Sequence, residues 1–369
     1  MIMTVIIFLI VLAALIFVHE LGHFAACRIF GIRVDEFALG FGPTIWKRKG
    51  KETVYALRAI PFGGFVKIFG EDPDDESIKG SDSSRSFVNA KRWKQAVVLV
   101  SGVLGNFIFA WLLATIALSI GTAASPSDYP EYANRMTDAR IMIDQVSPSS
   151  PAAVAGIKQG DVITAVSPIA VDLSTKPFSI DTIISNTKES AGKPLTLSLI
   201  RDGKPISVQI SAKQNIISDE PKAYAIGIAM SDAATLRLPI YLAAYESVRF
   251  TWVMMKEIYG VIAGLFQGAV SVSNLAGPVY IAQQVGDAAK LGFSYLLMFT
   301  AFISVNLGIL NILPIPALDG GRLLFVAIES VIRRRIKPII ANSVNLVGFA
   351  LLMLLMVFVT YRDILRMFK

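Results

Sequence analysis

The sequence predicts a polytopic α-helical membrane protein with four transmembrane helices, a membrane-associated β-hairpin and one small extracytoplasmic α+β domain. Three observations predict this class. Of the 369 residues, 54% are apolar and only 17% are charged, whereas soluble domains carry about 25% charged residues. Several long stretches contain no charged residue, and short alternating segments lie between the second and third of them. The net charge of +7 comes without basic runs interleaved with aromatics, so we expect no nucleic-acid partner.

Four stretches rich in Leu, Ile, Val, Phe and Ala contain no Asp, Glu, Lys or Arg, and they cover residues 1–18, 96–127, 291–318 and 338–361. Each is near or above the roughly 20 residues that cross a hydrocarbon core, the first by continuing past His19. We therefore expect spans at 1–27, 95–120, 295–320 and 342–361, with a tail at 362–369. Residues 258–286 are also uncharged but contain several polar side chains, so we expect an interfacial or re-entrant segment there.

The first apolar stretch is not expected to be a cleaved signal peptide. No Lys or Arg precedes it, although signal peptides begin with basic residues. Phe24 to Cys27 resembles a lipoprotein cleavage site, but the polar residues His19, Glu20 and His23 directly before it argue against processing.

Basic residues cluster in residues 28–94 and 319–337, close to the flanking spans. Such clusters stay in the cytoplasm, so we expect a cytoplasmic hairpin segment at 28–94 and a basic cytoplasmic loop at 321–341. Two crossings between them satisfy this arrangement, and a fifth span would not. Both chain termini are then extracytoplasmic.

The extracytoplasmic domain is expected at 125–215, with a linker at Ser125–Ser127 and amphipathic helices in a further linker at 216–294. Within it, Ile141–Ile143 reads as a strand, Ile180–Ser190 as a helix, and an Asp-Gly turn separates two further strands. The SPAxxAGIKQGDVI arrangement from Ser150 to Ile163 resembles a PDZ domain, which binds extended peptides by strand addition. Another small β-rich domain is the alternative.

His19, Glu20 and His23 form an H-E-x-x-H pattern in the first predicted span, and these are the only two histidines of the chain. Residues four apart on a helix lie on one face, about 6 Å apart along the axis. Two imidazoles can therefore converge on one metal ion while Glu20 reaches its water. Ionisable residues inside a span are costly and indicate function.

A catalytic zinc ion usually has three protein ligands, so one ligand is missing from this pattern. Cys27 continues the spacing of four residues, but it lies about 12 Å along the helix from His19, and we expect it to serve packing. Asp319 is the better candidate, because it follows a segment in which Pro314, Pro316 and Gly320 should break the helix. The four-span topology brings Asp319 and the histidines to the same cytoplasmic half of the membrane.

These residues resemble the site-2 protease family of intramembrane zinc metalloproteases (peptidase family M50), in its bacterial RseP-like form. The resemblance extends along nearly the whole chain and rests on seven features besides the spans: H-E-L-G-H, F-G-P at 41–43, P-F-G-G-F-V-K at 61–67, S-G-V-L-G-N-F at 101–107, the PDZ pattern, N-L-A-G-P at 274–278, and N-I-L-P-I-P-A-L-D-G-G at 311–321.

The resemblance implies one Zn²⁺ per chain, bound by His19, His23 and Asp319, with Glu20 as the general base. It also implies substrate-handling roles, which fall on Asn311, Pro314, Pro316, Gly42 and Phe65. The stretch Val34–Phe69 resembles a membrane-associated β-hairpin that pairs with an unwound substrate helix; a plain cytosolic hairpin is the alternative.

Two features depart from the family pattern. RseP has two tandem PDZ domains, whereas one PDZ pattern is present here, and this leaves the screening of substrates by size in doubt. Arg322 stands where many relatives have His, which we take to be peripheral.

The expected function is regulated intramembrane proteolysis in a bacterial inner membrane by a zinc metalloendopeptidase. The expected substrates are single-span proteins, either anti-sigma-factor-like or remnant signal peptides, after a first cut outside the membrane. The PDZ domain would bind a peptide or a new substrate C-terminus, or act as a size filter. A zinc transporter or a membrane-anchored PDZ scaffold remain alternatives, although neither explains Glu20 between two ligands.

Overall fold

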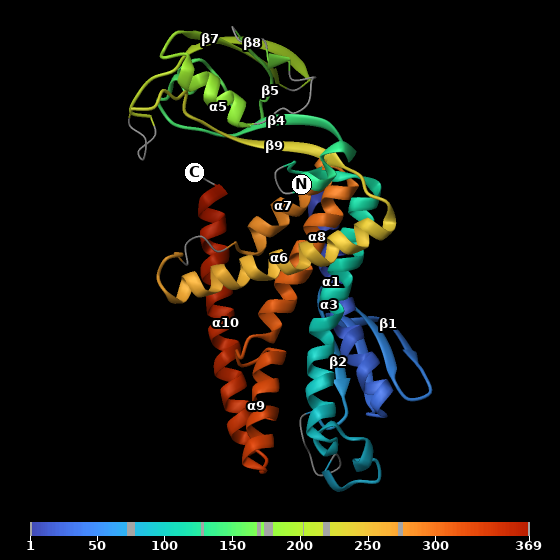
Figure 1. The fold of residues 1–369 in the computed structure, drawn as a ribbon. Helices are drawn as coiled ribbons and strands as arrows, with labels where there is room; N and C mark the ends of the chain where they lie inside the picture. The colour runs from blue at the N-terminus through green and yellow to red at the C-terminus, as the bar shows by residue number, and fades with distance from the viewer. Residues whose placement is uncertain are drawn as a thin grey trace. The chain divides into compact units, whose positions relative to one another are not determined.

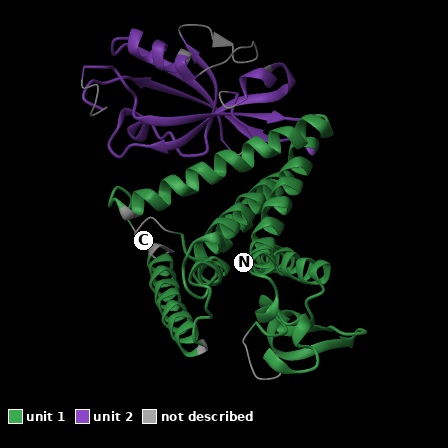
Figure 2. Cartoon of the chain, turned by 60° about the horizontal axis from the view of Figure 1, so that its bottom comes forward, with its two compact units in different colours: residues 1–119, 239–369 green, residues 120–238 purple. Residues whose placement is uncertain are grey.

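The structure is a computed structural model that describes residues 2–71, 78–126, 129–167, 171–172, 180–201, 203–216, 222–271 and 276–367. It divides into two compact units (Figure 2). Unit 1 contains residues 1–119 and 239–369, and unit 2 contains residues 120–238.

Unit 1 is mainly helical (Figure 1). Its principal elements are α1 (Ile2–Phe30), β1 (Val34–Lys49), β2 (Val54–Ile68), α3 (Arg92–Ile120), α6 (Ile240–Phe266), α7 (Pro278–Leu291), α8 (Phe293–Ile312), α9 (Asp319–Ile332) and α10 (Pro338–Met367). Among the described residues, four helices are long and apolar enough to cross a membrane, namely α1, α3, α8 and α10. They correspond to the four predicted spans. The segment 258–286 is shared between α6 and α7, neither of which is in this group.

Two predicted boundaries in unit 1 differ from the structure. The third span was expected to reach residue 320, but α8 ends at Ile312. The segment 321–341 was expected to be a loop, but most of it belongs to α9 and to the start of α10. The consecutive Arg333–Arg335 suggested a loop, whereas the residues before them form a helix because Val326 and Leu323 pack into an apolar cluster with α1 and α3.

Helices α1 and α3 approach each other through glycine. A Cβ added to Gly22 would lie 2.2 Å from the carbonyl oxygen of Ser101, and one added to Gly105 would lie 2.8 Å from that of Val18. Neither position therefore tolerates a side chain without separating the helices. This close approach brings the polar face of α1 directly against α3.

Strands β1 and β2 form the predicted antiparallel hairpin, but they are long enough to fold over and pair twice. Phe37 pairs with both Val66 and Tyr55, and Ala38 pairs with both Phe65 and Ala56. The register makes a sheet of four segments in the order 64–68, 34–39, 54–57 and 46–49. Within the described residues, segment 64–68 is therefore one edge of this sheet.

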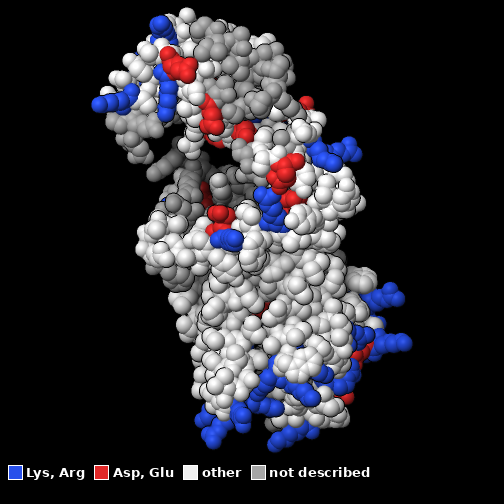
Figure 3. Space-filling view, viewed as in Figure 1, with Lys and Arg blue, Asp and Glu red and all other residues white. Residues whose placement is uncertain are grey.

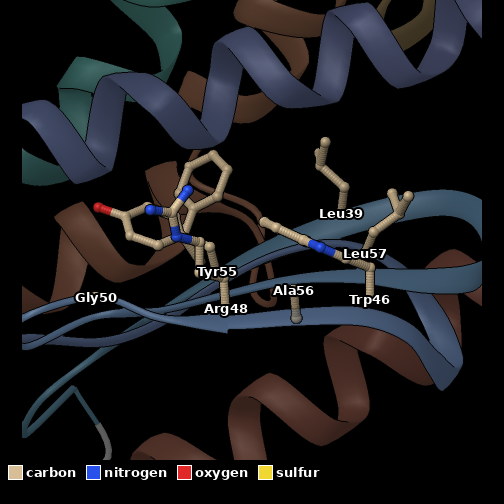
Figure 4. Close-up of a pocket in the computed structure, with 8 residues that line it drawn as sticks. Leu39, Trp46, Arg48, Gly50, Tyr55, Ala56 and Leu57 are labelled. Carbon is tan, nitrogen blue, oxygen red and sulfur yellow. The ribbon is translucent and has the colours of Figure 1, made fainter.

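The hairpin has a hollow of about 620 Å³ on one face, with a mainly apolar lining (Figure 4). Leu39, Tyr55 and Leu57 point to this face, whereas Ala56 points to the other, as the alternation of a strand requires. The sheet thus offers a largely apolar surface.

Helix α10 is fastened to α7 by a buried carboxylate. Asp363 is 3% exposed, and its oxygens accept hydrogen bonds from the backbone N–H groups of Gly277 (3.3 Å) and Tyr280 (2.9 Å) at the start of α7. A carboxylate at a helix N-terminus satisfies free donors and complements the helix dipole. Gly277 and Pro278 end the N-L-A-G-P motif; Asn274 and Leu275 lie outside the described residues.

Unit 2 is an α+β unit whose described strands form a sheet in the order β3-β9-β4-β5-β7-β8, with β6 beside β5. Its elements are β3 (Thr122–Ala124), β4 (Met136–Val146), α4 (Pro151–Val154), β5 (Val162–Ser167), β6 (Val171–Asp172), α5 (Ile180–Glu189), β7 (Pro194–Arg201), β8 (Lys204–Ser211) and β9 (Ile228–Leu236). The strand at Ile141–Ile143, the helix from Ile180 and the hairpin around Gly203 agree with the sequence. Asp202 of the predicted turn lies outside the described residues.

The predicted domain boundary of 125–215 was too narrow. Strand β9 lies between β4 and β3 in the sheet, so the compact unit extends from Ile120 to Leu238. The pairing of β9 with β4 joins residues that are far apart in the sequence, and local patterns do not reveal such a pairing.

Candidate metal centre

Helix α1 places His19 and His23 on one face and holds their rings together. Both residues are buried, and their Nε2 atoms lie 3.2 Å apart. The ring planes are nearly perpendicular, at 86°. The predicted convergence of the two imidazoles is therefore present.

Asp319 reaches the histidines because the chain breaks between α8 and α9. Leu313 is extended after the last turn of α8, and Ala317 adopts a left-handed conformation with φ of 72°. Gly320 and Gly321 pack directly against this broken segment: an added Cβ would lie 2.1 Å from the Leu313 carbonyl oxygen at one and 2.3 Å from that of Ile315 at the other. Asp319 is consequently the first residue of α9.

The three side chains present a compact triangle of ligand atoms. Oδ2 of Asp319 lies 3.0 Å from Nε2 of His19 and 3.2 Å from Nε2 of His23. A tetrahedral ion with ligand bonds of about 2.0–2.2 Å separates its ligand atoms by about 3.3–3.6 Å. The observed triangle is close to that size, and two imidazoles with one carboxylate are a donor set that suits zinc. The residues therefore fit this metal.

Helix α3 forms the wall of the site. His23 donates a hydrogen bond from Nδ1 to the carbonyl oxygen of Val98 at 2.8 Å. Gly102 leaves room for the rings, because an added Cβ would lie 2.3 Å from Nε2 of His23 and 2.8 Å from Cε1 of His19. One turn further, the Asn106 amide lies 3.2 Å from Nδ1 of His19.

Glu20 lies beside the triangle, within electrostatic range of His19, His23 and Asp319, and its carboxylate accepts a hydrogen bond from the backbone of Val66. Gly64 is also adjacent, since a Cβ added there would lie 3.5 Å from Cγ of Glu20. The edge segment 64–68 of the hairpin therefore runs past the predicted base.

The predicted substrate-handling residues lie in different places relative to the triangle. Asn311 lies in the last turn of α8, and Pro314 and Pro316 belong to the broken segment that leads to Asp319. Phe65 is part of the edge segment, where its ring lies under the Arg58 guanidinium at 4.9 Å, whereas Gly42 lies in the exposed outer part of the hairpin.

Cys27 is absent from the cluster of possible metal ligands among the described residues. It is fully buried in an apolar cluster with Val98 and Leu99, which agrees with a packing role.

Sequence reasoning missed four contributors to this site. Val98 was read only as part of a span, and Gly102 and Asn106 were noted within the S-G-V-L-G-N-F motif without a role, although an Asn inside an uncharged run is a signal in itself. Arg322 was taken to be peripheral, yet it forms an ion pair with Glu71 and lies within electrostatic range of Glu20.

His19, Glu20 and His23 lie on α1, a helix that can cross a membrane, and Asp319 joins them from the start of α9. Two histidines and a carboxylate beside a glutamate are the arrangement expected of a metallopeptidase site in a multi-pass membrane protein. Comparison with known proteins gives the family: residues 7–355 match the model of peptidase family M50, and the chain belongs to this family. It is a zinc metallopeptidase with zinc as its cofactor.

Its relatives agree along nearly their entire length. The chain is 33% identical over 360 residues to a protein of Clostridium acetobutylicum named for zinc metalloprotease activity, covering 98% of this chain and 97% of the relative. It is 32% identical over 444 residues to the regulator of sigma-W protease RasP of Bacillus subtilis, covering 99% of both chains. It is 30% identical over 439 residues to the zinc metalloprotease RasP of Geobacillus kaustophilus, covering 99% of this chain and 98% of the relative. A peptidase family decides against the transporter and scaffold alternatives.

Proposed function

We propose that this protein carries out regulated intramembrane proteolysis, with His19, His23 and Asp319 holding one zinc ion and Glu20 serving as the general base. The observation that carries the proposal is the ligand triangle itself, with edges of 3.0–3.2 Å. The three residues come from two helices that are some 300 positions apart in the sequence.

Bound zinc supplies the Lewis acidity that favours attack on a peptide carbonyl. Glu20 takes a proton from the attacking water and then donates it to the nitrogen of the leaving amine, so that it ends the cycle unprotonated. The hydrogen bond from the Val66 backbone orients the Glu20 carboxylate before substrate arrives.

A substrate transmembrane helix must unwind before hydrolysis, because its carbonyls are hydrogen-bonded within the helix. Two features support a local mechanism for this. Within the described part of the hairpin, segment 64–68 is an edge of the sheet, and its Val66 donates to the neighbouring Glu20. The end of α8 with Asn311 and the broken segment with Pro314 and Pro316 lead to Asp319 of the same site. An unwound stretch that pairs with 64–68 would pass the base in an extended form.

The arrangement of charge supports cytoplasmic hairpin and α9 segments and an active site towards the cytoplasmic half of a bacterial inner membrane. Figure 3 shows Lys and Arg gathered at one end of unit 1, around the start of α3 and the end of α9. A broad band without charged residues lies next to them. Basic residues that flank spans stay in the cytoplasm. In a background with Cys27 replaced by Ser, a cysteine at Arg334 should react with a membrane-impermeant maleimide only from the cytoplasmic side.

Unit 2 is proposed to be a single extracytoplasmic PDZ domain that reads an extended peptide, such as the C-terminus left by a first cut. A groove of about 660 Å³ lies between α5 and the stretch from Tyr224 to Met230. Strand β3 pairs only with Ala234–Leu236 at the end of β9. The start of β9 lines the groove, so a peptide bound there could pair with this part of β9 and extend the sheet.

Ile184 lines the groove and is 39% exposed, whereas Val154 on α4 is 83% exposed and does not line it. Ile184→Asp should weaken binding of a fluorescent peptide with an apolar C-terminus, and Val154→Asp should not. If Ile184→Asp binds the peptide normally, the size filter becomes the better account of unit 2.

Glu20→Gln is the central test of the proposed function. The variant should retain one zinc per chain and lose cleavage of a single-span model substrate, since the amide cannot take the proton. Glu257→Gln, which neutralises an exposed carboxyl on α6, is the matched control and should cleave normally. Normal turnover by Glu20→Gln would contradict the mechanism, and a comparison of membrane-protein fragments between the variant and wild type would identify the substrates.

A further inference from the structure

The two histidines of the cluster use their second ring nitrogens differently. His23 Nδ1 faces the Val98 carbonyl oxygen at 2.8 Å, and a carbonyl can only accept. Nδ1 therefore carries the hydrogen, and in the neutral ring Nε2 keeps its lone pair. His23 is thus fixed by the backbone in the form that a metal ligand requires.

The partner of His19 Nδ1 is a side-chain amide, which can present either a donor or an acceptor. His19 Nδ1 lies 3.2 Å from Nδ2 of Asn106, and an amide nitrogen can only donate. In this arrangement Nδ1 accepts, and the hydrogen of the neutral ring sits on Nε2, which faces Oδ2 of Asp319 at 3.0 Å. An Nε2 that carries hydrogen has no lone pair to offer a metal ion.

Asn106 has the means to reverse this. The residue is fully buried, and its Oδ1 has no hydrogen-bond partner among the described residues. A half-turn of the amide exchanges oxygen and nitrogen with almost no change in shape. Oδ1 would then accept from Nδ1–H of His19, and the Nε2 lone pair would face the triangle.

Helix α8 holds the backbone of Asn106 in place. Ser304 of α8 is fully buried and donates from Oγ to the Asn106 carbonyl oxygen at 2.8 Å. Gly308, one turn further along α8, lies against the Asn106 Cβ, since a Cβ added to Gly308 would come within 3.5 Å of it. Helix α8 thus fixes the position of the amide relative to His19.

We propose that Asn106 is a positioning residue that selects the tautomer of His19, with Oδ1 accepting from Nδ1–H when Nε2 binds zinc. The inference rests on the proposed function only in taking His19 as a ligand. The ring stays neutral throughout: the hydrogen leaves Nε2 and Nδ1 gains one.

The experiment uses the full-length purified protein with two readouts. Zinc affinity is measured by competition with a chromophoric chelator. The tautomer is read from the ring ¹⁵N resonances of histidine-labelled protein, which are few because the chain has only two histidines.

Asn106→Leu keeps a similar size but cannot accept, and its zinc affinity should fall about 10- to 100-fold. Asn106→Asp only accepts, so it should restore zinc affinity to at least the wild-type level and hold His19 as Nδ1–H even without metal. Gln95→Leu is the matched control: it removes another buried amide of α3, one that donates to Phe87 and Ala90, and should leave zinc affinity unchanged.

Wild-type zinc affinity in Asn106→Leu would overturn the proposal. A tenfold or greater loss in folded Asn106→Asp, or an Nε2–H form of His19 in metal-free Asn106→Asp, would also overturn it. His19→Ala distinguishes the two levels: if that variant keeps wild-type zinc affinity, the ligand assignment itself is wrong, whatever Asn106 does.

Discussion

Replacing Gly102 by Ala tests whether α3 shapes the metal centre by leaving space. The new Cβ would lie 2.3 Å from Nε2 and 2.6 Å from Cε1 of His23, and 2.8 Å from Cε1 of His19. Non-bonded heavy atoms prefer separations of about 3.5–4.0 Å. The distance between the new Cβ and the His23 ring is therefore too short by more than about 1 Å. The ring cannot simply turn away, because its other nitrogen is held by Val98 on the same helix.

The strain has two outlets, and both disturb the ligands. Either His23 moves and leaves the triangle, or α1 and α3 separate. A displacement of about 1 Å at a catalytic group can reduce activity about 100-fold. We expect zinc affinity to fall by at least about 100-fold in Gly102→Ala, equivalent to about 2.7 kcal/mol, and cleavage of a single-span substrate to be lost.

Two further alanine variants make the result interpretable. Gly260→Ala is the neutral control, since nothing lies within 4 Å of its Cβ. Gly105→Ala strains the contact between α1 and α3 at Val18 without touching either ring, so it should retain more zinc affinity than Gly102→Ala. Equal losses in both variants would assign the effect to helix separation, and normal zinc binding by Gly102→Ala would refute the reasoning.

Three other outcomes follow from described contacts. Val66→Pro removes the backbone donor beside Glu20, and it should abolish cleavage while zinc is retained. Lys49→Pro, on the opposite edge of the hairpin sheet, should leave most of the activity. Equal effects of the two variants on cleavage would contradict edge pairing. Hydrogen bonds from Arg201 hold the pKa of Asp161 below its ordinary value of about 3.9, so this pair stabilises unit 2 at neutral pH and the stabilisation is lost as pH falls below that value. Calorimetry between pH 3 and 6 should show an unfolding temperature that falls with pH in wild type and less so in Asp161→Asn, and parallel curves would refute the link. Asp363→Ala should release α10 from the start of α7 and increase hydrogen exchange in α7, with zinc affinity unchanged; unaltered exchange would argue against the cap.

The part of the site that sequence predicts best is the part encoded locally. His19, Glu20 and His23 are brought together by helical geometry alone, so their relative placement needed no tertiary information. Asp319 required more, namely the broken helix at Pro314 and the four-span topology. The structure brings its Oδ2 to within 3.2 Å of both rings.

The sequence did not predict the features of the site that depend on backbone atoms or on the absence of a side chain. Nothing in the residue type of Val98 marks its carbonyl as the partner of His23. Gly102 belongs to the S-G-V-L-G-N-F motif, but the motif does not tell which side chains lie against this glycine. The double register of the hairpin and the place of β9 between β3 and β4 could not be predicted for a related reason. Both depend on which distant segment pairs with which, and alternation within one strand does not specify its partner.

Helix α3 nevertheless carries a pattern that explains why it forms this wall. Val98, Gly102 and Asn106 follow each other at intervals of four, so they lie along one stripe that turns only about 40° at each step. The stripe presents first a carbonyl to His23, then a gap for both rings, then an amide to His19. The two histidines are four residues apart on α1, whereas Val98 and Asn106 are eight residues apart on α3. The two rings therefore lie between their partners on α3, with His23 next to Val98 and His19 next to Asn106. A side chain in the gap would displace the rings, and an apolar residue in place of the amide would leave the tautomer of His19 undetermined. Helix α3 therefore contributes no atom to the triangle, yet its spacing sets the position of the rings, and in our proposal it also sets the nitrogen that His19 turns to zinc.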